Sequence, residues 1–290
     1  MRDYAILTDT SCDLPAALAW DLNLETLPLT VSIGAHAYHG YLDWREMPVK
    51  DFYDTLRAGA IARTSAVSPF QFAQAYDGLL ASGKDILVIS LASALSATAA
   101  NAREAADAAI AKHGGRIEMI DSRSASMGEG LLVYLAAQAK KSGMSLSECT
   151  DYTRRMITRV LHWFTVGDPR YLKRGGRLSA SAAQEAGEKL HIMPVMRMDG
   201  EGRLVGAGRV RGRRAAIRAL ADKLEAEAQD IQTQTVFISH GDCATDAEEL
   251  KSLVLGAGAR EVIVGPVGPV IGAHAGPGTL AIFFIGKTRS

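Results

Sequence analysis

A single histidine, His274, stands within the segment 268–278, where four glycines and two prolines surround it. Proline fixes φ and removes a backbone donor, whereas glycine permits positive φ and a close approach of the backbone. This pattern predicts a rigid loop that holds the imidazole in one direction. A tight connection with an incidental histidine would show the same pattern. A functional role for His274 is therefore indicated only in combination with other polar residues.

Hydroxyl side chains occur at two other places where an expected strand gives way to an expected helix. Thr64 and Ser65 precede a capped helix, and Ser93 and Ser96 follow a continuous apolar strand. In open α/β sheets, ligands bind beyond the carboxyl ends of the strands, where helix N-termini offer free N–H groups. Serines at such turns usually only cap their helices. Hydroxyls combined with an imidazole, however, predict a clamp for one carboxylate.

Common catalytic and metal-binding motifs are absent from the sequence, which contains no G-x-S-x-G, no H-E-x-x-H and no G-x-G-x-x-G after a strand. Residues 286–288 imitate the end of a phosphate-binding loop, but Ala281 replaces its first glycine. We therefore expect no metal and no cofactor. A Ser/His acyl-ester hydrolase, with Ser93 as nucleophile and His274 as base, stays open as an alternative. A hydrolase would also need a residue that orients the imidazole, and the sequence identifies none.

The first half of the chain alternates between short apolar runs and helical segments. Strand-like runs at 4–8, 86–91 and 117–120 enclose expected helices at 68–82 and 95–112. This β-α-β-α order predicts an α/β domain with a mainly parallel sheet flanked by helices. Capping-box pairs mark three expected helix starts, namely Ser68 with Gln71, Ser145 with Glu148 and Thr245 with Glu248.

The second half has a different pattern, because residues 199–202 separate two strand-like runs and predict a β-hairpin. We therefore expect an α+β second domain with antiparallel strands. The predicted division is 1–160, which carries the head-group loops, and 161–290, which closes over the ligand. The apolar run 279–285 is the closing strand, which could return to the first domain.

Composition excludes several classes of protein. The chain of 290 residues is 48% hydrophobic, and its 32 basic and 32 acidic side chains balance, so charge gives no argument for nucleic acid or an anionic membrane. Three widely spaced cysteines fit a reducing compartment. We see no signal peptide and no apolar stretch of membrane-spanning length, and expect a cytoplasmic protein without stable membrane insertion.

Seven ordered signatures, covering essentially the whole chain, resemble the DegV family of bacterial fatty-acid-binding proteins, which includes the FakB subunits that serve a separate fatty-acid kinase. The signatures lie at 6–15, 63–69, 93–98, 121–128, 171–179, 210–213 and 268–278. The resemblance implies a two-domain DegV-like fold and a lipid-binding carrier rather than an enzyme. It also implies a long-chain fatty acid as ligand and a fatty-acid kinase as partner.

The family pattern implies which residues hold the ligand. The carboxylate would contact Thr64, Ser65, Ser93 and His274, with Ser96 a weaker candidate, while the acyl chain runs into an apolar tunnel between the domains. Burying a CH₂ group contributes about 0.8 kcal/mol, so some fifteen methylenes contribute on the order of 10 kcal/mol before binding costs. The sequence departs from the family at Ala97 and Ala275, where glycine and threonine are common, and this puts the fine head-group network in question.

A basic stretch at 170–218 carries twelve Lys or Arg against four Asp or Glu, an excess of eight positive charges. A solvated basic face is the plain interpretation. A regulatory nucleic-acid-binding role is a third hypothesis, but such a site would need aromatic residues, and only Tyr171 occurs in the stretch. The resemblance favours docking of the kinase partner through Arg174, Arg177 and Arg211.

Overall fold

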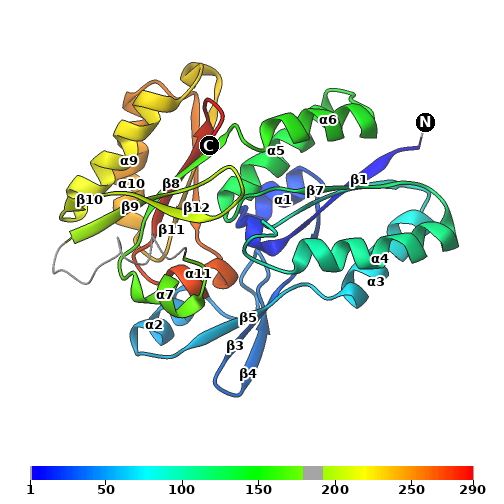
Figure 1. Cartoon of the computed structure of the whole chain (residues 1–290), viewed down its shortest axis with the longest axis horizontal. Coiled ribbons are helices and arrows are strands. Elements are labelled where there is room, and N and C mark those ends of the chain that lie inside the picture. Colours follow the sequence, from blue (N-terminus) through cyan, green and yellow to red (C-terminus); the bar gives the residue numbers. More distant parts are fainter. Residues whose placement is uncertain (1, 179–191, 290) are drawn as a thin grey trace.

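Three β-sheets organise the chain, which the computed structural model describes over residues 2–178 and 192–289. A parallel four-stranded sheet and a mixed six-stranded sheet lie on opposite sides of the molecule, and a small three-stranded sheet lies below them (Figure 1). The predicted α/β fold with an α+β second half is confirmed. The domain division at about residue 160 stays a prediction.

The four-stranded sheet has the order β2-β1-β6-β7, and all its strands run parallel. Its strands are β2 (Glu25–Leu27), β1 (Tyr4–Asp9), β6 (Asp85–Ser90) and β7 (Ile117–Asp121). Every residue of β1 and β6 is buried, and successive side chains point to opposite faces of a strand. Thus Ile6 packs into one hydrophobic cluster and Leu7 into another. Cover on both faces explains the continuous apolar runs in the sequence.

Helices cover both faces of this sheet. On the Leu7 face lie α3 (Pro69–Ala81) and α4 (Thr98–His113), and on the Ile6 face lie α5 (Met127–Lys141) and α6 (Leu146–Met156). The short α1 (Ala16–Asp21) follows β1. The predicted capping boxes at Ser68 and Ser145 are confirmed, since each serine accepts from the backbone of the third helical residue and that residue's side chain reaches back.

The six-stranded sheet has the order β10-β9-β8-β13-β11-β12. Its strands are β10 (Leu204–Arg211), β9 (Ile192–Met198), β8 (Val160–Thr165), β13 (Leu280–Ile285), β11 (Thr235–His240) and β12 (Glu261–Pro266). Only the β11–β12 pair is parallel. The predicted hairpin is the β9–β10 pair, and the closing strand β13 lies in this sheet. Helices α9 (Arg213–Glu227) and α10 (Ala244–Gly256) pack against it.

The third sheet, with order β4-β3-β5, was not expected from the sequence. It contains β4 (His36–His39), β3 (Thr30–Ile33) and β5 (Ala62–Ser65), and α2 (Val49–Arg57) precedes β5. Residues 25–33 form two separate strands, β2 and β3, rather than one. Pro28 lies between them and lacks the N–H that a continuous ladder requires. The β3–β4 hairpin projects at the bottom of Figure 1.

Two local predictions are wrong. Thr245 does not cap a helix, because it lies within the first turn of α10, which begins at Ala244 after Cys243 and has no side-chain cap. The expected rigid loop at His274 is a short helix, α11 (Pro269–Ala275), with proline in its first turn. Glycine serves close packing there: a Cβ on Gly272 would lie 2.7 Å from the Tyr53 hydroxyl. Gly276, at φ +78°, ends the helix.

Buried carboxyl groups hold the turn that follows β1. Asp9 accepts from the Leu91 N–H at 3.0 Å and joins the ends of β1 and β6, and it also accepts from Ser11. Ser11 lies 3.0 Å from Glu129 as well. Asp13 accepts from Ser126 at 2.5 Å. Burial raises the pKa of all three carboxyls, that of Asp13 to about 8.

The titration of Asp13 should therefore lower the stability of the protein as the pH rises through the neutral range. The unfolded chain releases the Asp13 proton near pH 3.8, whereas the folded chain keeps it to about pH 8, so rising pH favours unfolding between these values. We expect the melting temperature of Asp13→Asn to depend less steeply on pH than that of the wild type. Calorimetry from pH 5 to pH 9 measures both slopes, and equal slopes would show that Asp13 titrates normally.

Candidate ligand-binding cavity

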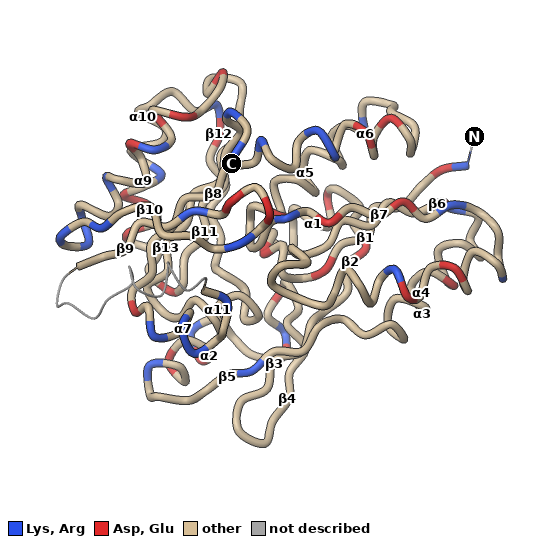
Figure 2. Tube along the Cα trace, viewed as in Figure 1, with Lys and Arg blue, Asp and Glu red and all other residues tan. Residues whose placement is uncertain are grey.

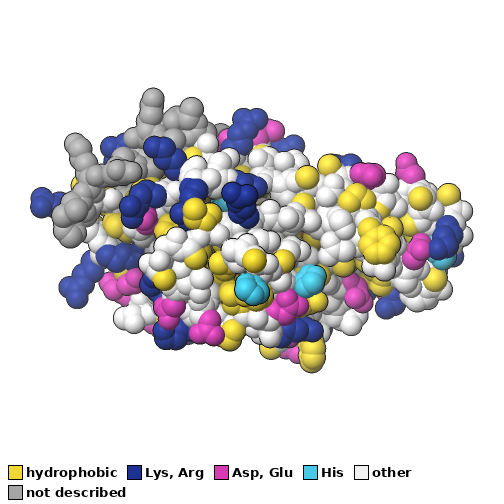
Figure 3. Space-filling view, turned by 90° about the horizontal axis from the view of Figure 1, so that it is seen from below, with side chains coloured by type: hydrophobic (Ala, Val, Ile, Leu, Met, Phe, Trp, Pro, Cys, Tyr) yellow, Lys and Arg dark blue, Asp and Glu magenta, His cyan; other side chains and the backbone are white. Residues whose placement is uncertain are grey.

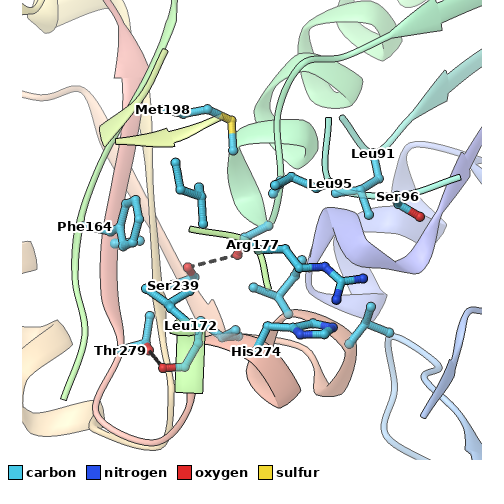
Figure 4. A pocket seen from close by; sticks show the side chains of 18 of the residues that line it. Leu91, Leu95, Ser96, Phe164, Leu172, Arg177, Met198, Ser239, His274 and Thr279 are labelled. Atoms are coloured by element: carbon cyan, nitrogen blue, oxygen red, sulfur yellow. Dashed lines mark hydrogen bonds between the residues drawn. The ribbon is translucent and has the colours of Figure 1, made fainter. Parts of the chain in front are cut away.

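An internal cavity of about 290 Å³ lies where the six-stranded sheet meets the loops at the carboxyl ends of the parallel strands (Figure 4). One wall comes from β8, β11 and β13, and another from α11 and α7 (Arg170–Gly175). Apolar side chains make up most of the lining, including Leu91, Leu95, Phe164, Leu172, Met198, Leu204, Ile271 and Phe283. Such a cavity fits a ligand that is apolar along most of its length.

Helix α11 runs along the cavity and presents one face to it. Val270, Ile271, His274 and Ala275 all contribute to the lining, at the spacing that places residues on the same side of a helix. His274 is therefore aimed inward by helix geometry rather than by a loop. Its position in the last turn places it at one end of the wall.

At that end, the His274 Nε2 atom lies 2.8 Å from the Thr64 hydroxyl. Thr64 is on β5, so the third sheet, α11 and the cavity meet here. The buried Nδ1 atom has no hydrogen-bond partner among the described residues. The backbone of Gly175 lies against it, and a Cβ on Gly175 would be 2.5 Å from Nδ1. Glycine at this position makes room for the imidazole.

The imidazole is neutral at physiological pH, because burial and then the nearby Arg177 charge lower the pKa of His274 to about 4. A neutral ring with its proton on Nε2 donates to the Thr64 oxygen. The Thr64 hydroxyl proton is then free to bond an acceptor in the cavity. The pair can thus hold one acceptor group, such as a carboxylate oxygen.

Arg177 is the one charged side chain that lines the cavity within the described residues. Figure 4 shows its guanidinium beside the His274 ring. The sequence placed this arginine on a docking surface, but the structure places it at the polar end of the cavity. A positive charge there would attract an anionic head group.

The two serines that follow β6 have different surroundings. Ser96 lines the cavity, and its hydroxyl lies 2.9 Å from that of Thr98. Ser93 is exposed, does not line the cavity, and donates to Asp121 at 2.5 Å. Thr64 and His274 thus meet directly, and Ser96 lines the same cavity while bonded to Thr98, whereas Ser93 does not line it.

Ser65 also lies apart from this group. It follows Thr64 on strand β5, and neighbouring strand residues point to opposite sides. Thr64 lines the cavity whereas Ser65 is exposed and does not. The ligand roles predicted for Ser65 and Ser93 have no support from their positions.

Arg174 and Arg211 are on the surface, in contrast to Arg177. The Arg174 guanidinium stacks over the Tyr171 ring, 4.9 Å from its centroid, and Arg211 ends strand β10. Lys and Arg positions recur along α7, β9, β10 and α9 (Figure 2), and Figure 3 shows basic side chains gathered over the end of the molecule that carries the six-stranded sheet.

Within residues 2–178 and 192–289, no cluster of His, Cys, Asp or Glu has the arrangement of a metal site. Across the same residues, no helix combines the length and the apolar character that crossing a membrane requires.

Several residues of the cavity lining were not predicted from the sequence. Ser126 and Ser239 both line the cavity, yet they come from segments 113 residues apart. His162 lines it from the middle of β8. The only signal in the sequence was the 121–128 signature, which carried no assigned role. Long-range sheet pairing brings these residues together, and local patterns do not predict it.

The fold and the site together define a class of α/β protein in which a parallel sheet and a mixed sheet enclose an apolar cavity with a hydroxyl–imidazole pair at one end. The family model described as "uncharacterised protein, DegV family" matches residues 3–287. A DegV domain-containing protein of Clostridium perfringens is 36% identical over all of this chain and 99% of its own length. The chain belongs to the DegV family.

Solved structures match the whole fold. A DegV family protein from Thermus thermophilus, described by its fatty-acid binding, is 29% identical with a TM-score of 0.89, and 99% of this chain and 100% of that chain are covered. A DegV family protein from Ruminococcus gnavus, described with vaccenic acid, has a TM-score of 0.88 at 20% identity, covering 97% of this chain and 99% of its own. The latter likeness concerns the fold alone.

Proposed function

We propose that this protein binds a long-chain fatty acid in the cavity, with the carboxylate at Thr64, Ser96, His274 and Arg177. The observation that carries the proposal is the shape of the site: a mainly apolar cavity whose one end holds a neutral imidazole bonded to a hydroxyl. The fatty-acid binding described for the Thermus thermophilus relative supports it.

The two ends of the ligand contribute differently. Each buried methylene contributes about 0.8 kcal/mol, so the chain supplies most of the affinity. The head-group residues chiefly fix direction, because hydrogen bonds to a charged group contribute about 1.5–3 kcal/mol. Arg177 supplies the positive charge that the neutral His274 lacks.

A carrier accounts for these residues better than the hydrolase alternative does. A serine hydrolase needs its nucleophile near a base whose other nitrogen is held by a third group. Ser93 donates to Asp121 outside the cavity lining, and the His274 Nδ1 atom has no partner among the described residues. We therefore propose a cytoplasmic carrier that presents the carboxylate to a separate fatty-acid kinase.

Affinity for saturated fatty acids should rise with chain length, by about fourfold per methylene, until the cavity is filled. Displacement of a fluorescent fatty acid by the series from lauric to stearic acid measures this rise. Fatty alcohols of equal length serve as controls for the head group, and should bind more weakly. A flat series would argue against burial of the chain in the cavity.

The kinase role predicts a separate effect at the surface. Reversing the charges of Arg174 and Arg211 together should slow phosphorylation by a cognate kinase at low salt while leaving fatty acid bound, because complementary charge mainly accelerates association. Salt should shrink the difference. The matched control reverses Arg103 and Lys141, which are exposed on α4 and α5. Equal rates for both double variants would leave the basic face without a docking role.

A further inference from the structure

Two serine hydroxyls form a second polar site in the cavity, away from the head-group residues. Ser126 and Ser239 both line the cavity, and their Oγ atoms lie 3.1 Å apart. Ser126 also donates to the buried Asp13 at 2.5 Å. Figure 4 shows the Ser239 hydroxyl and its hydrogen bond among the cavity side chains, on the side away from Ser96.

The backbone around this pair is held in unusual conformations. Ser126 has φ 55° and ψ −149°, a region that is almost reserved for glycine, and Asp13 has φ 52°. Two residues with positive φ thus bond each other at the cavity wall. Gly268 completes the contact, since a Cβ there would lie 2.2 Å from an Asp13 oxygen. Strain of this kind persists only where the surrounding structure enforces it.

The cavity lining includes another buried polar side chain, His162. His162 lines the cavity, is 3% exposed, and its Nε2 atom has no hydrogen-bond partner among the described residues. Burial keeps the pKa of His162 well below its usual value, and burial raises the pKa of Asp13 to about 8. The two serines, Asp13 and His162 are therefore largely uncharged at neutral pH, and the Arg289 guanidinium lies 3.4 Å from the His162 Nδ1 atom. An uncharged set of hydroxyls and imidazole suits a neutral polar group rather than a second carboxylate.

The contact of Asp13 with the start of α11 indicates how far the serine pair lies from the head group. Asp13 contacts Gly268, just before the helix, whereas His274 is in its last turn. Six residues at 1.5 Å rise place Gly268 and His274 about 9 Å apart along α11, and Asp13 links Gly268 to the serine pair. An extended chain advances about 1.2 Å per bond, so the offset corresponds to about eight bonds.

We propose that Ser126 and Ser239 form a subsite for a hydroxyl group carried near the middle of the acyl chain, so that the ligand class includes mid-chain hydroxylated fatty acids. This inference rests on the proposed function. The ligand's hydroxyl would donate to the serine pair, whose own protons are engaged with Asp13 and within the pair, in an otherwise apolar wall.

Displacement assays with 10-hydroxystearic acid and stearic acid test the subsite. We expect the wild type to bind the hydroxy acid about 2- to 10-fold tighter, as one neutral hydrogen bond allows. Terminally hydroxylated stearic acid should show no such gain. In Ser126→Gly, which removes the hydroxyl and suits the positive φ, the affinity ratio between the mid-chain hydroxy acid and stearic acid should fall to one or below. The control Ser252→Ala, at an exposed position on α10, should keep the wild-type ratio.

The outcomes separate this inference from the proposed function. Stearic acid binding with a ratio of one in the wild type would overturn the subsite alone. A preference that survives unchanged in Ser126→Gly would do the same. Failure of the wild type to bind either acid would overturn the proposed function, and the subsite with it.

Discussion

Replacing Gly175 by alanine is expected to weaken fatty-acid binding by about 10- to 150-fold, which is the loss of one hydrogen bond to a charged group. The new Cβ would lie 2.5 Å from the His274 Nδ1 atom, so the imidazole must move. Movement breaks the 2.8 Å contact with Thr64 and takes both groups away from the carboxylate. Crowding should also lower the free energy of unfolding by about 1–3 kcal/mol.

Gly78→Ala is the matched control for this substitution. Gly78 lies within α3, and a Cβ there meets no atom within 4 Å. Alanine favours helix over glycine by up to about 1 kcal/mol, so this variant should be as stable as the wild type or more so, with unchanged affinity. Titration with a fluorescent fatty acid and thermal melts measure both variants. Wild-type affinity in Gly175→Ala would mean that His274 does not hold the head group.

Removing the Thr64 hydroxyl should have a comparable effect. Thr64→Val keeps the shape of the side chain but removes the group that bonds the His274 Nε2 atom. We expect affinity to fall by about 10- to 150-fold, because a buried carboxylate loses a donor and the imidazole loses its partner.

The two serines after β6 make the most discriminating comparison. Ser96→Ala should weaken binding, because Ser96 lines the cavity, whereas Ser93→Ala should leave affinity near that of the wild type. The Ser93 hydroxyl is already bonded to Asp121 and is exposed. The same titration compares Thr64→Val, Ser96→Ala and Ser93→Ala. A larger loss in Ser93→Ala than in Ser96→Ala would place the head group elsewhere.

The elements of the fold could be predicted where one local pattern decides the structure. The apolar runs of β1 and β6 predict strands covered on both faces, and the boxes at Ser68 and Ser145 mark true helix starts. Thr245 carries the same pattern, yet α10 begins at Ala244, two residues before the start that the pattern predicts. Spacing alone does not fix a helix start, because tertiary packing also determines where the first turn forms.

The site was harder to predict than the fold. Thr64 and His274 meet although 210 residues separate them, and the resemblance to the family, not their spacing, paired them. Ser65 could have been separated from Thr64 by strand alternation, had residues 62–65 been predicted as a strand instead of a turn. Arg177 was read as part of a charged surface, because composition does not distinguish an arginine that faces solvent from one that faces a cavity.

The central claim is that the cavity holds one fatty acid, and lipid mass spectrometry of the purified protein tests it most directly. The protein is denatured and extracted, and released fatty acid is compared with protein concentration. A sample saturated with stearic acid, with excess lipid removed, guards against loss during purification. We predict about one fatty acid per chain in the wild type, and markedly less in Thr64→Val after equal washing. Absence of fatty acid from the saturated wild type would contradict the account.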